Sequence, residues 1–212
     1  MTRDEAVARI QRGLSFRRNL TDEIIASLEE ARIELENGVT LPNFLLVEDA
    51  PLLLVAGTNT LSLPDGFIRQ EQLEPLRYFP ESTETPLFIP WKSYGDALLA
   101  YSDFSASGPK VATLRASTIR IFPDADVDYS LTWSYYKHSE ALNGPDADAN
   151  AWLANCPDAL IGEAGLRMAE DLEDDAAMAK FNRMMNKGKR QYIFEKIARE
   201  EAGGPIVMGV NN

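Results

Sequence analysis

The stretch STIRIFPDADVDYSLTWSYYK, residues 117–137, decides the fold class of the chain. From Val127 to Tyr135 apolar and polar residues alternate, as they do in a strand with one buried and one exposed side. A Pro-Asp-Ala-Asp turn at 123–126 separates this run from the apolar run before it. We therefore predict antiparallel strands that bury one side of the sheet and leave the other side solvated or facing a partner.

Weaker strand signals precede this stretch. Residues 58–67, TNTLSLPDGF, alternate leucine with polar residues before a Pro-Asp-Gly turn, and residues 86–90, PLFIP, form a short apolar run between prolines. Between these runs and the decisive stretch, Ser93 and Asp96 have the spacing of a capping box. The middle of the chain is thus predicted to be rich in strands, with one short helix.

Both ends of the chain have helical periodicity instead. Thr2 and Glu5 are spaced as a capping box ahead of a first helix, and a second helix is predicted to end at Gly38 in the left-handed conformation. The apolar positions of the second helix recur at intervals of three and four. Its other faces carry charged residues that we predict to be solvated. These residues are Glu29, Glu30, Arg32, Glu34 and Glu36.

Two further helices are predicted after the acidic loop at 143–150. Pro157 suits the first position of a helix, because its missing N–H would lack an intrahelical partner there in any case. Asp174 and Asp175 are placed to cap the last helix. Gly188 falls in the middle of that helix, where it indicates either a close approach by another element or a bend.

These patterns predict an α+β chain. The N- and C-terminal helices are expected to form an antiparallel bundle, with an antiparallel β-rich region inserted between them and an extended arm at the C-terminus. The predicted boundaries are 1–40 for the N-terminal helices, 41–140 for the β-rich region with its short helix, 141–202 for the C-terminal helices and 203–212 for the arm.

Composition limits the chemistry that the chain can support. One cysteine and one histidine in 212 residues exclude an intrachain disulfide and a site with several histidine ligands. The charged N-terminus lacks the apolar core of a signal peptide, and the longest apolar run, residues 50–57, is too short to cross a bilayer. We expect a soluble, unexported protein without a membrane partner.

Charge is distributed unevenly. The formal net charge is −12, yet residues 176–201 hold seven Lys or Arg against three Asp or Glu, which leaves 14 against 30, or −16, elsewhere. An acidic body binds nucleic acid poorly, because attraction to phosphates supplies non-specific affinity. The basic segment has an open interpretation: a solvated face, a nucleic-acid contact, an acidic partner, or an acidic neighbouring copy. Its candidate interface residues are Lys180, Arg183, Lys187, Lys189 and Arg190.

Catalytic and metal motifs are missing from the sequence. It contains no P-loop, dinucleotide fingerprint, zincin helix, nucleophile elbow or Cys-x-x-Cys pair. A catalytic pair of Cys156 as nucleophile and His138 as base would also need a residue that orients the histidine, and the sequence indicates none. The acids Asp124 and Asp126 lie in a turn, where aspartate is common for structural reasons. We predict no catalytic residue, metal site or cofactor.

The order of elements resembles the head-to-tail adaptor proteins of tailed bacteriophages. The similarity is carried by the decisive stretch at 117–137, by RNLTDEIIASLEEARIELE at 18–36 and by WLANCPDALIGEAGLRMAEDLEDDAAMAKF at 152–181. In these proteins a strand that ends in two tyrosines and a basic residue leads to a Trp-Leu, a Pro-Asp at a helix start and an acidic turn. The matching residues are Tyr135, Tyr136, Lys137, Trp152, Leu153, Pro157, Asp158, Asp174 and Asp175.

This resemblance implies a structural role in the virion, at the interface between head and tail, after assembly in the host cytoplasm. Adaptors of this kind form a ring, usually of twelve copies, beneath the portal protein. They extend the channel for packaged DNA without binding a specific sequence, and they attach the next tail component, such as a nozzle, stopper or tail tube. The resemblance also implies a portal-binding arm, whose apolar anchors would be Ile206, Val207, Met208 and Val210.

Within the resemblance, residues 152–158 take a structural part. Trp152 and Leu153 would fill the joint between sheet and bundle, Cys156 would be a small buried residue, and Pro157 with Asp158 would start a helix. Two other functions stay open from sequence. One is a virion-associated cell-wall hydrolase that uses a pair of acids, and the other is a DNA-binding module built on the basic C-terminal helix.

Overall fold

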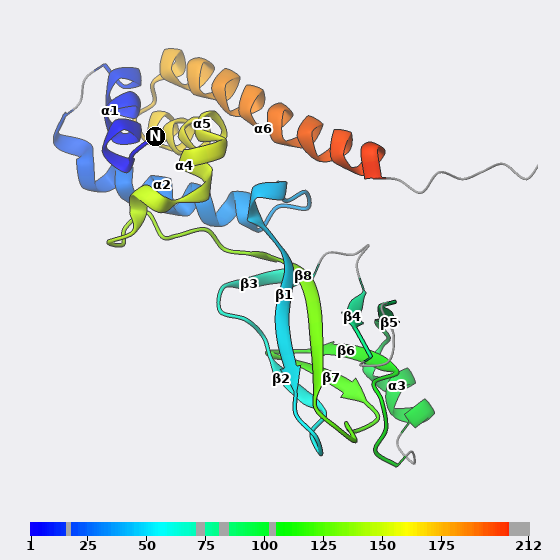
Figure 1. Ribbon diagram of the computed structural model, residues 1–212. Helices are drawn as coiled ribbons and strands as arrows, with labels where there is room; N and C mark the ends of the chain where they lie inside the picture. Colours follow the sequence, from blue (N-terminus) through cyan, green and yellow to red (C-terminus); the bar gives the residue numbers. More distant parts are fainter. Residues whose placement is uncertain (16–17, 71–74, 81–84, 102–104, 204–212) are drawn as a thin grey trace, which may run out of the picture. The chain divides into compact units, whose positions relative to one another are not determined.

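The computed structural model describes residues 1–15, 18–70, 75–80, 85–101 and 105–203 (Figure 1). In these residues the chain forms six α-helices and two antiparallel sheets, which confirms the predicted α+β class. It divides into two compact units. The helical unit comprises Met1–Leu45 with His138–Asn212, and the β unit comprises Leu46–Lys137.

The helical unit contains five of the α-helices. They are α1 (Arg3–Gly13), α2 (Thr21–Glu36), α4 (Ala151–Asn155), α5 (Pro157–Asp171) and α6 (Asp175–Gly203). Short 3-10 turns lie at η1 (Arg18–Leu20), η2 (Asn43–Leu45) and η3 (Ala147–Ala149). Helix α5 packs against α1, α2 and α6, and its buried residues include Leu160, Ile161 and Met168. The buried side of α5 therefore supplies the centre of this unit.

Local capping explains where several helices begin. Thr2 and Glu5 form the predicted capping box at α1, and the Asp174 carboxylate accepts the Ala177 N–H at the start of α6 at 3.0 Å. The prediction for Gly38 is wrong. Helix α2 ends at Glu36 and its C-cap is Asn37. Among the described glycines only Gly57 and Gly66 have a positive φ, so Gly38 is not left-handed.

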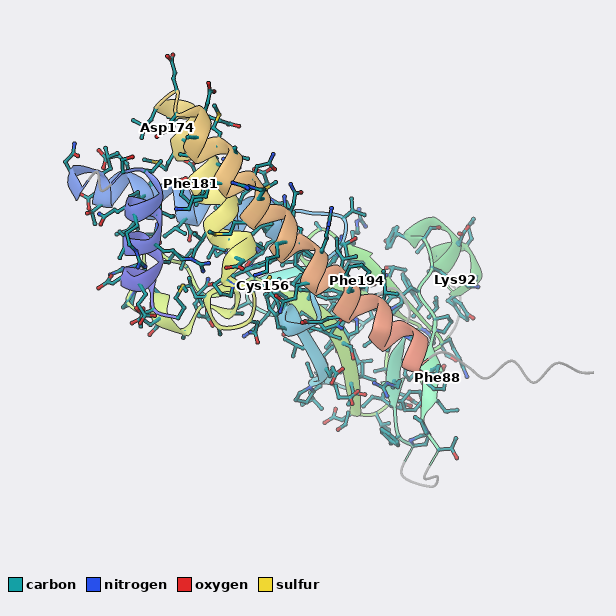
Figure 2. All side chains as sticks on the ribbon, turned by 90° about the horizontal axis from the view of Figure 1, so that it is seen from above. Phe88, Lys92, Cys156, Asp174, Phe181 and Phe194 are labelled. Atoms are coloured by element: carbon teal, nitrogen blue, oxygen red, sulfur yellow. The ribbon has the colours of Figure 1, made fainter. Side chains whose placement is uncertain are left out.

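Glycines allow α5 and α6 to approach closely. A Cβ added to Gly162 would lie 2.3 Å from the backbone nitrogen of Met185, and one added to Gly188 would lie 2.3 Å from that of Ala159. Two helix backbones thus meet without side chains between them at these points. Of the two alternatives predicted for Gly188, a close approach or a bend, the structure shows the close approach. Figure 2 shows Phe181, which is fully buried, on the first half of α6.

The β unit contains eight strands and the short helix α3 (Tyr94–Tyr101). The strands are β1 (Leu46–Leu54), β2 (Thr60–Ser62), β3 (Phe67–Gln70), β4 (Leu76–Tyr78), β5 (Leu87–Ile89), β6 (Val111–Arg115), β7 (Thr118–Phe122) and β8 (Tyr129–Lys137). One sheet has the order β1-β8-β4-β5, with β3 also paired to β8, and the other has the order β2-β7-β6. Every strand pair is antiparallel.

The decisive alternation largely corresponds to the sides of β8. Leu131, Trp133 and Tyr135 are buried in the core of the β unit, whereas Ser130 is exposed and Thr132 half-buried. Ser134 departs from the pattern because it is 1% exposed. A bulge in β1 between Val47 and Ala50 brings the Asp49 N–H to the Ser134 hydroxyl, so this polar side chain is covered and bonded.

Candidate functional site

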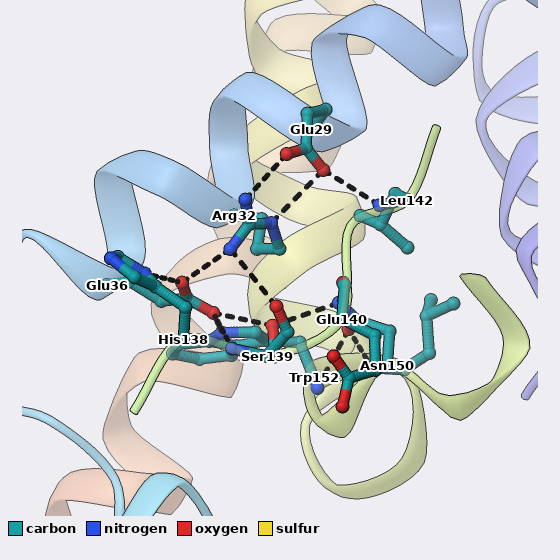
Figure 3. Close-up of polar contacts among 10 residues, drawn as sticks. Glu29, Arg32, Glu36, His138, Ser139, Glu140, Leu142, Asn150 and Trp152 are labelled. Carbon is teal, nitrogen blue, oxygen red and sulfur yellow. Dashed lines mark hydrogen bonds and ion pairs between the residues drawn. The ribbon is translucent and has the colours of Figure 1, made fainter. Parts of the chain in front are cut away.

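A buried polar cluster surrounds Glu36, the last residue of α2. Its side chain is 0% exposed. Figure 3 shows the polar contacts around it. One carboxylate oxygen accepts hydrogen bonds from the Ser139 N–H at 3.1 Å, the Ser139 hydroxyl at 2.5 Å and the Trp152 indole N–H at 3.1 Å. The other lies 2.6 Å from Arg32 Nη1 and 2.6 Å from His138 Nδ1. The ion pair with Arg32 and the hydrogen bonds together offset the free energy that is lost when the Glu36 carboxylate leaves water.

Arg32 extends this cluster to Glu29. Its guanidinium binds the Glu29 carboxylate through Nη2 at 2.6 Å and Nε at 3.1 Å, a two-point contact that fixes both side chains. Burial by itself would raise the pKa of Glu29. The hydrogen bonds from Arg32 and from the Leu142 N–H outweigh this effect, so the pKa lies below its ordinary value.

The predicted solvated face of α2 is therefore wrong for three of its five residues. Arg32 and Glu36 are buried and Glu29 is half-buried, whereas the Glu30 and Glu34 side chains are exposed and contact Arg167. Residues 29, 32 and 36 recur at intervals of three and four, so they share one side of the helix. In the sequence, the buried cluster was indicated only by opposite charges at this helical spacing and by the single histidine of the chain.

The cluster fixes the segment that follows the β unit. Strand β8 ends at Lys137, and the next two residues, His138 and Ser139, both bind Glu36. Asn150 continues the network: its amide donates to the Glu140 carbonyl at 2.5 Å, and its carbonyl oxygen accepts the Trp152 N–H at the start of α4. Four donors and the His138 ring surround the Glu36 carboxylate, so both of its oxygens are occupied by contacts within the helical unit. The arrangement is that of an anchor.

Residues 152–158 lie in this same unit. Trp152 is fully buried and makes edge contacts with Phe44 at 5.0 Å and Tyr192 at 5.6 Å between ring centroids. Leu153 is also fully buried, Pro157 is the first residue of α5, and Asp158 pairs with Arg9 at 2.8 Å. Trp152 is the residue that connects an apolar contact to the Glu36 cluster.

Cys156 and His138 do not form a nucleophile and base. The buried Cys156 thiol donates to the Gly188 carbonyl at 3.4 Å, and burial raises its pKa, which disfavours the reactive thiolate. His138 is bound to Glu36. The acids Asp124 and Asp126 also have structural partners, since they accept from Asn59 and from the Tyr129 hydroxyl.

The five basic candidates on α6 have different surroundings. Lys187 binds Asp158 at 3.2 Å and Lys189 binds Glu163 at 2.9 Å, so both join α6 to α5. Arg183 donates to the Ala179 carbonyl one turn earlier, Lys180 lies 5.9 Å from the Phe181 ring centroid, and Arg190 is exposed. Three of the five charges thus remain at the surface of the helix without an ion pair in the described part of the chain.

A family model described as SU10 adaptor protein matches residues 1–209. The chain belongs to the SU10 adaptor family. This match confirms the resemblance to phage head-to-tail adaptors, and it supports a structural adaptor rather than an enzyme. Comparison with curated proteins gave no match.

The C-terminal arm expected of this SU10 adaptor family member falls mostly on residues that the structure does not describe. The predicted arm anchors Ile206, Val207, Met208 and Val210 lie outside the described residues, and Gly203, predicted to begin the arm, is the last residue of α6.

Within the described ranges, no group of three or more His, Cys, Asp or Glu side chains could hold a metal ion. No helix in those ranges has the length and apolarity that a bilayer crossing needs.

Proposed function

We propose that this protein forms a ring that docks beneath the portal of a tailed phage, extends the DNA channel and carries the next tail component. The ring would contain about twelve copies, as the resemblance implies. The protein would act at the head-to-tail interface of the virion, after assembly in the host cytoplasm. It would work through shape and contacts between chains rather than by catalysis.

The family match over residues 1–209 is the observation that carries this proposal. The charge distribution agrees with it. Outside residues 176–201 the chain has a formal net charge of −16. This negative charge would repel the phosphates of passing DNA, so DNA would move through the channel without adhering. The buried Glu36 and Glu163 bind residues of the helical unit, which agrees with a structural part for these acids.

Finer parts of the proposal follow from the same role. The antiparallel bundle would be the rigid ring-forming body, and Trp152, Leu153, Pro157 and Asp158 would hold its joint to the inserted β region. Arg183, Arg190 and Lys180 would meet acidic groups of a neighbouring copy. Residues 204–212 would bind the portal through Ile206, Val207, Met208 and Val210.

Co-sedimentation with the portal protein of the same phage tests this function. We expect the chain to be largely monomeric alone and to appear as a ring beneath the portal by electron microscopy. A full-length variant with serine at the four arm anchors should lose portal binding and keep its helicity. A control with serine at exposed Leu99, in α3, should bind normally. Failure of the natural sequence to bind any portal complex, or cell-wall clearing by the purified chain, would overturn the proposal.

A further inference from the structure

A groove of about 510 Å³ lies in the helical unit where the end of α2 meets α6. One wall comes from residues between Glu34 and Thr40, and the other comes from the middle of α6. Val39 is 92% exposed and Ile193 is 37% exposed, so the described part of the chain leaves both side chains open to the groove. The apolar side chains that line it are Leu35, Val39, Tyr192 and Ile193.

The apolar lining continues from the groove toward the end of α6. Ile197 follows Ile193 by four residues, so it lies one turn further along the same side of the helix, and it is 43% exposed. Helix α6 has 29 residues against 15 in α5, and its second half runs beyond the helix on which its first half packs (Figure 1). We call Val39, Ile193 and Ile197 the groove strip.

The chain that follows α6 is long enough to return to this strip. From residue 193 to residue 203 the helix covers about 15 Å, at 1.5 Å per residue. The seven residues 204–210 can cover about 23 Å when extended, at about 3.3 Å each. Two residues are therefore available for a reversal, and the sequence at 203–205 is Gly-Gly-Pro, which is typical of turns.

The chemistry of the returning segment fits the strip. Residues 203–212 include no charged side chain, so their burial removes no ion from water. In an extended segment Ile206, Met208 and Val210 lie on one side, at intervals of about 6.6 Å. Ile193 and Ile197 recur at about 6 Å along α6. Apolar side chains on the two segments thus meet at nearly the same spacing.

We propose that residues 206–210 bind the groove strip of their own chain, with Val210 in the groove and Met208 against Ile197. The occupant is the same chain because a short tether holds the segment at an effective concentration of about 1 mM, far above that of a second copy in dilute solution. The contact goes beyond the proposed function and needs no portal. Its consequence rests on that function: the groove and the portal compete for the same anchors.

A disulfide tests the contact in the full chain. Val39→Cys with Val210→Cys places one thiol in the groove and one on the segment, while the natural Cys156 is buried. Under mild oxidation of dilute protein without portal, this pair should link within one chain about 10-fold faster than the control pair, Glu23→Cys with Val210→Cys. Glu23 is exposed and lies 12 residues, or about 18 Å, before Leu35 on α2.

Non-reducing electrophoresis and intact mass distinguish the outcomes. Ile197→Asp should slow the link about 10-fold, because it places a charge on the strip. Gln191→Asp is the matched control and should leave the rate unchanged, since exposed Gln191 and Ile193 are two residues apart and face different sides of α6. Links between chains would assign the segment to a second copy, and equal rates for the two cysteine pairs would show that it does not occupy the groove. Either result overturns the inference.

Portal binding separates this inference from the proposed function. The oxidised Val39→Cys, Val210→Cys protein should not co-sediment with the portal, and reduction should restore binding. Portal binding by the oxidised protein would refute the competition. A link that forms in a chain that binds no portal in either state would refute the proposed function and leave the contact intact. Unchanged circular dichroism shows that each variant folds.

Discussion

The two units bury tryptophan in opposite ways. Trp152 of the helical unit and Trp133 of the β unit are both 0% exposed. The indole N–H of Trp152 donates to the Glu36 carboxylate, whereas that of Trp133 has no partner in the described residues. Trp133 is instead surrounded by rings, with Phe67, Trp91 and Tyr135 at 5.3, 5.7 and 5.1 Å between centroids.

This difference shows what each unit depends on. The helical unit stabilises a buried charge with directed bonds, so its interior tolerates little change in donors and acceptors. The β unit depends on apolar area and ring contacts, which are lost gradually as atoms are removed. Single substitutions in each unit should separate these two kinds of interior.

Glu36→Gln should have the largest effect. The neutral amide leaves the buried Arg32 and its neighbouring donors with too little negative charge, and breaking a buried ion pair by removing one partner costs about 3–4 kcal/mol. Urea unfolding followed by circular dichroism measures this loss. The control is Glu30→Gln, on the same helix as Glu36. It removes an exposed carboxylate that lies 3.6 Å from Arg167 of α5, and it should lower the free energy of unfolding by less than about 1 kcal/mol. Equal losses for the two variants would contradict the importance of burial.

The contrast between the units also explains which parts of the structure were predictable. Alternation from Val127 to Tyr135 predicted β8, because a sheet with one buried side imposes a period of two. The capping residues Thr2 and Asp174 predicted helix starts, because caps act locally. Such signals need no knowledge of distant residues.

The Glu36 cluster depends on distant residues and was missed for that reason. Its partners Ser139 and Trp152 lie more than 100 positions away in sequence. On α2 alone, a charged residue predicts a solvated face, and only the fold shows which side faces the returning chain. Ser134 was misjudged similarly, because a bulge on another strand covers it.

Gly162→Ala and Gly95→Ala should have effects of opposite sign. A Cβ at Gly162 would lie 2.3 Å from the Met185 backbone, so α5 and α6 must separate, at a cost of about 2–3 kcal/mol. At Gly95, in α3 of the β unit, nothing lies within 4 Å of the added Cβ, and alanine should stabilise by about 0.5 kcal/mol. Thermal unfolding of the two single variants measures both. A stabilised Gly162→Ala protein would show that the helices do not pack this closely.

Trp152→Phe and Trp133→Phe compare the two tryptophans directly. Both changes remove similar ring area, but only the first deprives a buried carboxylate of a donor. Trp152→Phe should therefore lower the free energy of unfolding by about 1.5 kcal/mol more than Trp133→Phe does, because a hydrogen bond to a charged group contributes about that much. Urea titration of both variants at the same pH gives the difference. Equal losses would mean that the indole bond to Glu36 contributes nothing to stability.

The smallest differences should appear in the response to pH, at opposite ends of the scale. In the helical unit the pKa of Glu29 is lowered from its ordinary 4.5, so its contribution to stability is present above about pH 4.5 and is lost as the pH falls through the lower folded value. In the β unit, burial and the hydrogen bond to Asp126 raise the pKa of Tyr129 to about 12, so its contribution is present below about pH 10 and is lost as the pH rises toward 12.

Glu29→Gln should flatten the decline in unfolding free energy on the acid side and leave the alkaline side unchanged, whereas Tyr129→Phe should do the reverse. Denaturant unfolding across both ranges measures the two slopes, and absorbance of the tyrosinate form follows Tyr129 itself. Acid sensitivity that persists in Glu29→Gln would assign that loss to other carboxylates. Because the two groups belong to different units, the double variant should show the sum of the two changes.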